Sequence, residues 1–430
     1  MKRLDTGSAD FEAGFVALLA DRETESGRVD KPVAAILEDV RTRGDAAVCE
    51  LTSKFDRLPL TPDQLRITAE EIDAETAKVP QDQIDALNVA ASRIEAFHRA
   101  QLPKDMEFTD ADGVTLGQRW NALDAVGLYV PGGKAAYPSS VLMNAIPAHV
   151  AGVERLAMCV PTPDGVLNPL VLAAAKRSGV TEIYRIGGAQ AVGAMAYGTE
   201  TIHPVDRIVG PGNAYVAEAK RQVFGRVGID SIAGPSEVVV VADNQNNPRL
   251  VALDLMAQAE HDELAQSILI TNDAAFGDAV AAAVETELKT LTRSAIASAS
   301  WRDFGAIITV ANWDEAAKLV DRIAPEHLEL MLDDPKSVFA KVRHAGAAFL
   351  GRFCPEAVGD YVGGPNHVLP TSRTARFASG LSVYDFLKRT TYIAADREAL
   401  EKIGPAGVTL ANAEGLEAHA LSISARLGNS

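Results

Sequence analysis

The sequence predicts an α/β fold with two parallel-sheet units in tandem. From about residue 125, short apolar runs alternate with helical stretches, and the same alternation starts again near Glu237. Strands that alternate with helices in this way form parallel sheets covered by helices. The 430 residues suffice for two or three domains of about 150 residues each. Because the second run repeats the first, we expect two similar units, as an old duplication would produce.

Composition and charge exclude several classes of protein. With 47% hydrophobic and 23% charged residues, the chain has the composition of a globular protein, which excludes disorder and a collagen-like structure. The 41 basic and 58 acidic residues give a formal net charge of -17, which repels nucleic-acid phosphates. We therefore expect a neutral or cationic small substrate and no nucleic-acid partner.

The cysteines and the chain start indicate a cytoplasmic protein. Cys49, Cys159 and Cys354 are too few and too far apart for a disulfide framework or a cysteine zinc site. The first 15 residues carry acidic side chains and no long apolar core, and no later stretch reaches about 18 apolar residues in a row. We expect neither a targeting peptide nor a membrane partner.

The first 120 residues are expected to be mostly helical. Thr68 and Glu71 have the spacing of a capping box, with Ile67 and Ile72 placed as the flanking hydrophobic staple. A second helix follows Pro80. Apolar residues three and four apart give it one apolar face: Ile84, Leu87, Ala91 and Ile94.

The two α/β units follow in order. In the first unit we expect strands at 125–130, 155–161, 182–188 and 206–210, and helices at 141–150, 168–179, 191–198 and 214–224. In the second unit we expect strands at 237–243, 267–271, 305–310, 327–332 and 347–351. The pattern breaks near Arg373 into a mixed tail that ends in an amphipathic helix at 411–427. Such a helix is not stable alone, so we expect it to pack on another subunit.

Three glycine-rich turns end strands of the first unit, at 129–133, 187–190 and 210–213. Glycines let a backbone approach a phosphate, and the following helix presents its N-terminus to the anion. None is a full G-x-G-x-x-G, since Tyr215 stands where the third glycine of the last turn would be. A single such turn is better explained as a tight turn. Three at the carboxyl edge of one sheet favour a ligand site.

Four of the eight histidines come with carboxylates or amides. Gln258 and His261 are three apart in a helical run and could reach one ion, and Asp360 and His367 bracket a glycine-rich loop. His419 lies in the last helix. Histidine, aspartate and glutamine ligands without cysteine suit zinc or manganese. A hydrogen-bonded histidine remains the alternative for His261 and His419, because no H-E-x-x-H is present.

The other four histidines are expected to be structural or solvent-facing, without a nearby partner: His98, His149, His203 and His344. Glu414 and His419 are five apart, so on a helix they diverge by roughly 140°, and we expect different roles for them.

Glu326 and His327 are adjacent at the start of the strand at 327–332, after Pro325. Their side chains are expected on opposite sides of the strand, where they could serve two different proton transfers. The alternative, which these residues by themselves favour, is a pair of exposed polar groups in the loop before a strand.

Together these segments resemble the histidinol dehydrogenase family over nearly the whole chain. The motifs that carry the resemblance are GLYVPGG around Tyr129, GGAQAVGAMAYG around Gln190, GPGNAYV around Asn213, AGPSE around Ser236, QAEHD around Gln258 and His261, APEHLEL around Glu326 and His327, GDYVGGPNHVLPT around Asp360 and His367, and EGLEAH around Glu414 and His419. So many motifs in the same order make the resemblance to this family specific.

The resemblance implies a cytoplasmic homodimer with shared active sites that oxidises L-histidinol through L-histidinaldehyde to L-histidine with two NAD. It implies one zinc ion per subunit, held by Gln258, His261, Asp360 and His419 and by two substrate nitrogens. The implied substrate contacts are these four ligands together with Ser236, Glu326, His327, His367 and Glu414. The implied NAD contacts are Tyr129, Gln190 and Asn213.

In this scheme His327 is the base for the alcohol proton and Glu326 the base for the water that attacks the aldehyde. The implied fold has two incomplete Rossmann-like domains. We expect a helical segment at 1–25, a first domain of 26–124 and 237–372, a second of 125–236, and an arm at 373–430 that crosses to the partner subunit. Three alternatives remain: oxidation of another alcohol, a zinc hydrolase that uses Glu326 and metal-bound water, and a non-catalytic structural protein.

Overall fold

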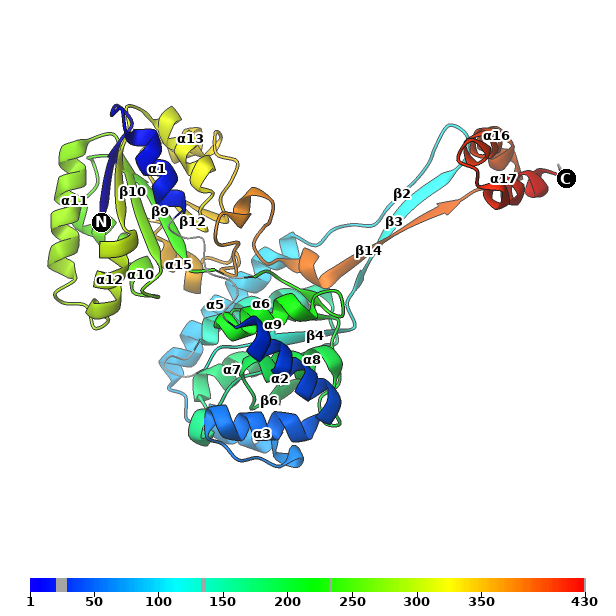
Figure 1. Cartoon of the computed structure of the whole chain (residues 1–430), viewed down its shortest axis with the longest axis horizontal. Helices are drawn as coiled ribbons and strands as arrows, with labels where there is room; N and C mark the ends of the chain where they lie inside the picture. The colour runs from blue at the N-terminus through cyan, green and yellow to red at the C-terminus, as the bar shows by residue number, and fades with distance from the viewer. Residues whose placement is uncertain (21–28, 133–136, 233, 429–430) are drawn as a thin grey trace.

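The computed structural model describes residues 1–20, 29–132, 137–232 and 234–428. It has two parallel sheets, each covered by helices, and an arm that projects away from both (Figure 1). The predicted α/β class is confirmed. No helix in the described ranges is long and apolar enough to cross a bilayer.

The first unit contains a five-stranded parallel sheet in the order β6-β5-β4-β7-β8. Its strands are β4 (Ala125–Tyr129), β5 (Arg155–Cys159), β6 (Glu182–Tyr184), β7 (Arg207–Val209) and β8 (Gly228–Ile229). Its helices are α6 (Pro138–Ala151), α7 (Pro169–Arg177), α8 (Gly188–Tyr197) and α9 (Ala214–Val223). All the elements expected in this unit are present.

The second unit contains a six-stranded parallel sheet in the order β1-β11-β10-β9-β12-β13. Its strands are β1 (Lys2–Asp5), β9 (Glu237–Ala242), β10 (Gln266–Thr271), β11 (Ala306–Thr309), β12 (His327–Met331) and β13 (Ala347–Leu350). Its helices are α1 (Phe11–Ala20), α10 (Pro248–Ala259), α11 (Ala274–Glu287), α12 (Ser294–Phe304), α13 (Trp313–Ile323), α14 (Pro335–Phe339) and α15 (Glu356–Tyr361).

The two units share one topology. In each, the first strand lies in the interior, the next two strands extend the sheet on one side, and the last two extend it on the other. The N-terminal strand β1 is an addition at the edge of the second sheet. The common order supports the duplication suggested by the sequence.

The N-terminal residues divide between the two units. Helices α2 (Asp30–Arg43), α3 (Asp45–Asp56), α4 (Ala69–Thr76) and α5 (Gln81–Ala100) pack on the five-stranded unit, and α5 also bonds to residues 362–366. The apolar face of α2 packs on α8, and the predicted stripe of α5 packs on α6. The expected boundary after residue 25 falls outside the described residues. The capping box of Thr68 and Glu71 at the start of α4 is confirmed.

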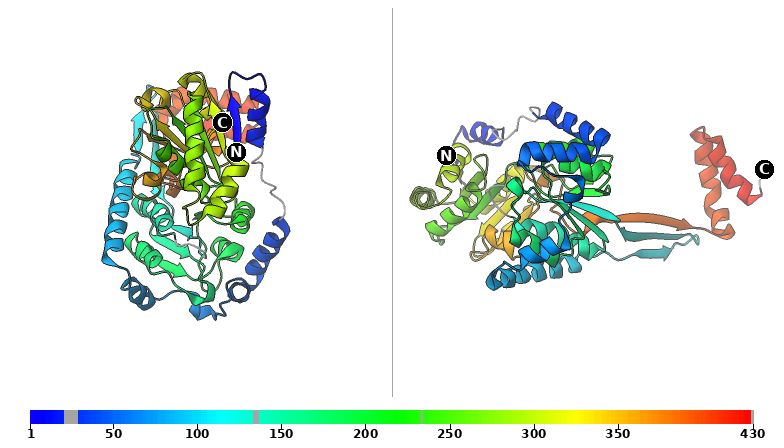
Figure 2. Two further views of the ribbon diagram at one scale, coloured as in Figure 1. Left: turned by 90° about the vertical axis from the view of Figure 1, so that its left-hand side faces the viewer. Right: turned by 90° about the horizontal axis from the view of Figure 1, so that it is seen from below.

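Two segments far apart in the sequence, 106–122 and 387–424, form the arm. Strands β2 (Met106–Thr109), β3 (Thr115–Ala122) and β14 (Leu387–Ala394) form an antiparallel sheet that carries α16 (Arg397–Ala413) and α17 (Glu417–Ser424). The helix expected at 411–427 is instead interrupted at Gly415, which has a φ of 73°. Figures 1 and 2 show these helices at the far end of the arm, away from both sheets. Ile393, Leu410 and Leu421 leave more than half of their surface exposed there.

Candidate active site

The glycine-rich turns lie at the carboxyl edge of the five-stranded sheet. Open α/β sheets bind ligands where the strand order reverses, which in this sheet is between β4 and β7. The turns after these two strands are the ones that begin at Tyr129 and Gly210. A Cβ atom on Gly210, which has a φ of 114°, would stand 2.0 Å from the carbonyl oxygen of Tyr129, so only glycine fits.

The three expected NAD contacts lie at this carboxyl edge: Tyr129 ends β4, Gln190 is in the first turn of α8, and Asn213 precedes α9. The hydroxyl oxygen of Tyr129 accepts a hydrogen bond of 3.0 Å from the N–H of Gly188, two residues before the buried Gln190. Asn213 caps α9, because its Oδ1 accepts from the N–H groups of Tyr215 and Val216. Burial raises the pKa of Tyr129 to about 12, so its hydroxyl stays protonated at neutral pH. Gly133, the last residue of the first turn, lies outside the described residues.

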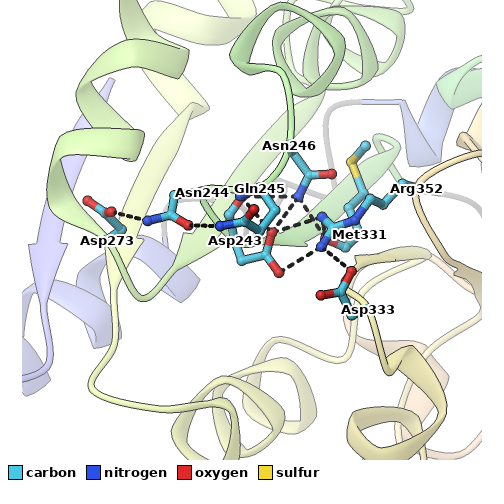
Figure 3. A network of polar contacts seen from close by, with 8 residues as sticks. All are labelled: Asp243, Asn244, Gln245, Asn246, Asp273, Met331, Asp333 and Arg352. Carbon is cyan, nitrogen blue, oxygen red and sulfur yellow. Dashed lines mark hydrogen bonds and ion pairs between the residues drawn. The ribbon is translucent and has the colours of Figure 1, made fainter.

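The corresponding edge of the six-stranded sheet is filled by charged side chains (Figure 3). Arg352 forms a bidentate ion pair with Asp243, after β9, and a further ion pair of 2.8 Å with Asp333, after β12. Asn246 donates to the carbonyl oxygen of Met331 in the same network. This network occupies the point where the strand order of the six-stranded sheet reverses. The candidate site of the second unit lies elsewhere.

That site lies at the opposite, amino edge of the six-stranded sheet. Glu326 and His327 stand at the start of β12, next to Glu237 at the start of β9, and α10 and α15 bring the metal candidates to the same place. A cleft of about 550 Å³ opens beside the metal candidate His261. It is lined from the second unit by Glu260, His261, Arg293 and Tyr361, and from the first unit by Tyr137, Pro138, Ser139, Asn168, Pro169 and Leu170, among others.

His327 is held by one ring nitrogen and has the other one available. Its Nδ1 lies 3.2 Å from the carbonyl oxygen of Glu237, 3.2 Å from Oε1 of Gln258 and 3.5 Å from Oε1 of Glu356. These are all acceptors, so Nδ1 carries the proton and Nε2 keeps its lone pair. Nε2 is buried and has no hydrogen-bond partner among the described residues. Burial lowers the pKa of His327 to about 4, so the imidazole is neutral at pH 7.

Glu326 is the second buried group at this edge. Its Oε2 accepts a hydrogen bond of 3.1 Å from the N–H of Glu237, and the Ser236 side chain bonds the same carboxyl. Burial, with the neighbouring charge of Glu237 adding to it, raises the pKa of Glu326 to about 8. The interpretation of Glu326 and His327 as an exposed loop pair is wrong, since they are only 6% and 4% exposed.

Several possible metal ligands meet beside His327. Nε2 of Gln258 lies 3.2 Å from Nδ1 of His261, as the spacing predicts, and Asp360 has an oxygen 3.8 Å from Nδ1 of His367. Ligand atoms of His327, Glu356 and Asp360 lie within 4.8 Å of one another. Burial and the neighbouring carboxylates raise the pKa of Glu356 well above its usual range. A divalent cation would relieve this repulsion, and the nitrogen and oxygen donors suit zinc.

Comparison with known proteins decides the family. The histidinol dehydrogenase family profile matches residues 19–427. The chain belongs to the histidinol dehydrogenase family. It is 72% identical to histidinol dehydrogenase of Gluconobacter oxydans over 99% of both chains, and 64% identical to that of Ruegeria pomeroyi over 99% of this chain and 98% of the relative. The crystal structure of histidinol dehydrogenase from Elizabethkingia anophelis superposes with a TM-score of 0.95 at 36% identity, covering 100% of this chain and 98% of that one.

Membership in the histidinol dehydrogenase family makes the chain an NAD-dependent oxidoreductase of histidine biosynthesis. The hydrolase and the non-catalytic alternatives are therefore wrong. The two parallel sheets and the small antiparallel sheet are the fold of histidinol dehydrogenase.

Two of the expected site residues are not near the others within one chain. Glu414 and His419 lie at the tip of the arm, whereas α10 and α15, which bear the other candidates, belong to the second unit (Figures 1 and 2). A histidinol dehydrogenase site that used His419 would need the arm of a second copy.

Two features of the site differ from what the residues alone indicate. Glu356 is not among the expected site residues, although it stands one helical turn before Asp360 on α15, a spacing that places both side chains on one face. His98 is not without a partner. It is buried on α5, its Nδ1 lies 2.8 Å from Oε1 of Gln101, and its Nε2 lies 3.5 Å from Nδ2 of Asn366, next to His367.

Proposed function

We propose that the chain carries out the zinc-dependent, four-electron oxidation of L-histidinol through L-histidinaldehyde to L-histidine with two NAD. The observation that carries this proposal is the buried Nε2 of His327, which has no partner in the described ranges, beside a buried carboxyl of raised pKa. A neutral imidazole and a glutamate that titrates near neutral pH are suited to two proton transfers in one site.

The proposed zinc ligands are Gln258, His261 and Asp360 of one chain and His419 of a second copy, with the imidazole and amino nitrogens of the substrate. Zinc, when bound, would hold the substrate by these nitrogens and keep one carbon in place through both oxidations. Glu356 adds a buried carboxylate whose charge favours cation binding. The proposed assembly is a homodimer with shared sites, and we place the reaction in the cytoplasm.

In the first oxidation, His327 Nε2 accepts the hydroxyl proton while the carbinol carbon transfers hydride to NAD. The products are the aldehyde, NADH and one proton. The main-chain carbonyl of Glu237 holds the imidazole in the required tautomer, because it accepts from Nδ1.

In the second oxidation, Glu326 accepts a proton from the water that attacks the aldehyde, and the anion of the hydrate forms. The carbon of this anion transfers hydride to a second NAD, and the carboxylic acid that results loses the third proton. One alcohol, one water and two NAD give one carboxylate, two NADH and three protons. Ser236, His367 and Glu414 are the proposed further substrate contacts, and Tyr129, Gln190 and Asn213 the proposed NAD contacts.

A stoichiometric assay with metal removal tests the proposal. Metal-free protein should form no NADH from L-histidinol, and zinc should restore two NADH per histidinol consumed. Metal-free protein that retains full turnover would contradict the zinc site, and a yield of one NADH would contradict the second oxidation. Zinc binding by Gln258→Ala, measured by titration without substrate, should weaken at least tenfold, since one ligand is lost.

A further inference from the structure

A buried ion pair lies under the glycine-rich turn that follows β7. Lys220, on α9, pairs with Asp230, which follows β8, and their side chains are only 3% and 5% exposed. Both groups also bind Gly210. Oδ2 of Asp230 accepts a hydrogen bond of 2.8 Å from the N–H of Gly210, and Nζ of Lys220 donates to its carbonyl oxygen at 3.1 Å.

The ion pair therefore holds both peptide groups of one residue. Gly210 is also confined from the other side, because it lies against the carbonyl oxygen of Tyr129 in a conformation that side chains rarely adopt. A buried ion pair gives little net stability compared with an apolar pair of the same volume, since both charges must be desolvated. A contribution to stability therefore does not by itself explain the Lys220–Asp230 ion pair.

The rest of the turn contains main-chain N–H groups that could bind a ligand. Pro211 has no N–H, and the N–H groups of Gly212 and Asn213 have no hydrogen-bond acceptor within the described part of the chain. They stand at the N-terminus of α9, where an anion such as a dinucleotide pyrophosphate is favoured. Moving the Gly210 peptide would move both donors.

We propose that Lys220 and Asp230 are positioning residues for NAD. They fix the peptide groups of Gly210, so that the donors of the turn from Gly210 to Asn213 are already in place when NAD binds. This inference rests on the proposed NAD contacts. A preorganised turn binds more tightly because less ordering is needed on binding.

Two double variants of the full-length protein test the inference. Lys220→Met/Asp230→Leu removes both bonds to Gly210 and leaves no buried charge. Lys220→Met/Asp230→Asn keeps an acceptor for its N–H. The matched control is Arg155→Met/Glu182→Leu, which removes a partly buried ion pair from the same sheet, between β5 and β6.

The readouts are the dissociation constant of NADH without substrate, by fluorescence titration, and the KM values for NAD and L-histidinol. We expect the Leu variant to raise the NADH dissociation constant and KM for NAD about tenfold, and the Asn variant about threefold. The kcat, KM for L-histidinol and zinc affinity should change less than about twofold. The control should bind NADH as the unmodified protein does.

Either double variant, folded by circular dichroism, that binds NADH as tightly as the unmodified protein would overturn the inference. An equal loss of NADH binding in the control would also overturn it, because the effect would then be one of general stability. Failure of the unmodified protein to bind NADH would contradict the proposed NAD site itself, which is a distinguishable result.

Discussion

The main-chain carbonyl oxygen of Glu237 lies 3.2 Å from Nδ1 of His327, between two neighbouring interior strands of the six-stranded sheet. The register of β9 and β12 places His327 opposite Val238, so this contact follows from the sheet itself. The orientation of the imidazole therefore depends on the pairing of β9 with β12.

The first prediction separates the two oxidations. His327→Asn should impair oxidation of L-histidinol more than that of supplied L-histidinaldehyde, and Glu326→Gln should do the reverse. Losing a well-placed base costs about 10²- to 10⁴-fold in rate, or about 3–5 kcal/mol of barrier. The measurement is steady-state NADH formation from each substrate.

Zinc binding is the control for both variants, since neither residue is a proposed ligand. Equal losses on both substrates in both variants would show that the proposed division of roles is wrong.

The second prediction concerns pH. Burial raises the pKa of Glu326 to about 8, so the carboxyl is mostly protonated at pH 7 and must ionise before it can accept a proton. The rate of aldehyde oxidation should therefore rise with pH and level off above about 8. In Glu326→Gln this rise should be absent, and a profile unchanged by the substitution would assign the titration to another group.

The third prediction concerns shared sites. His419 lies on the arm and His327 in the second unit (Figure 1). If the arm crosses to a partner, mixing His419→Ala with His327→Ala subunits should restore up to about a quarter of the activity, because some mixed dimers contain one intact site. No recovery after demonstrated subunit exchange would contradict the crossing.

Strand and helix positions could be predicted because they depend on local pattern. The apolar run from Glu237 to Ala242 is fully buried in β9, and Thr68 starts α4 as its capping box predicts. An apolar stripe shows only that a helix has a packing partner, not which one. The stripe of α5 therefore does not show which sheet the helix packs on.

Contacts between candidate residues close in sequence could be predicted, but the place of the candidate site in the fold could not. Gln258 and His261 meet as their spacing predicts, because one stretch of chain carries both. The surroundings of His327 include Gln258 and Glu356, which come from distant segments. The general rule for α/β sheets points to the carboxyl edge, which Arg352 fills (Figure 3), whereas this site occupies the amino edge.

The fourth prediction concerns the cysteines. Cys159 is fully buried in β5, and burial raises the pKa of its thiol and that of Cys49, so neither is a ready nucleophile. Cys354 is half-buried in the loop before α15. Replacing each of the three by Ala should change aldehyde oxidation by less than about threefold. A collapse of this step in folded Cys354→Ala would instead indicate a covalent thiohemiacetal.

The last prediction concerns the acidic pair behind the metal candidates. Asp254 on α10 is half-buried and shares a hydrogen bond with Glu329, whose Oε1 also accepts from the N–H of Glu356. Burial raises the pKa of Asp254 from 3.8 to about 6 and that of Glu329 well above its usual range. The folded state therefore binds the proton of Asp254 more tightly than the unfolded state does.

It follows that the free energy of unfolding of the metal-free protein should fall as pH rises from about 4 to 6, and that the loss persists above pH 6. Asp254→Asn removes the ionisable group while keeping its shape, so it should raise the free energy of unfolding at pH 8 by about 1–3 kcal/mol and change it little at pH 4.5. Urea unfolding of metal-free protein at both pH values measures this. The exposed Glu285→Gln on α11 is the control and should show no such difference. A gain of the same size at both pH values would mean that the benefit of Asp254→Asn does not come from the buried charge.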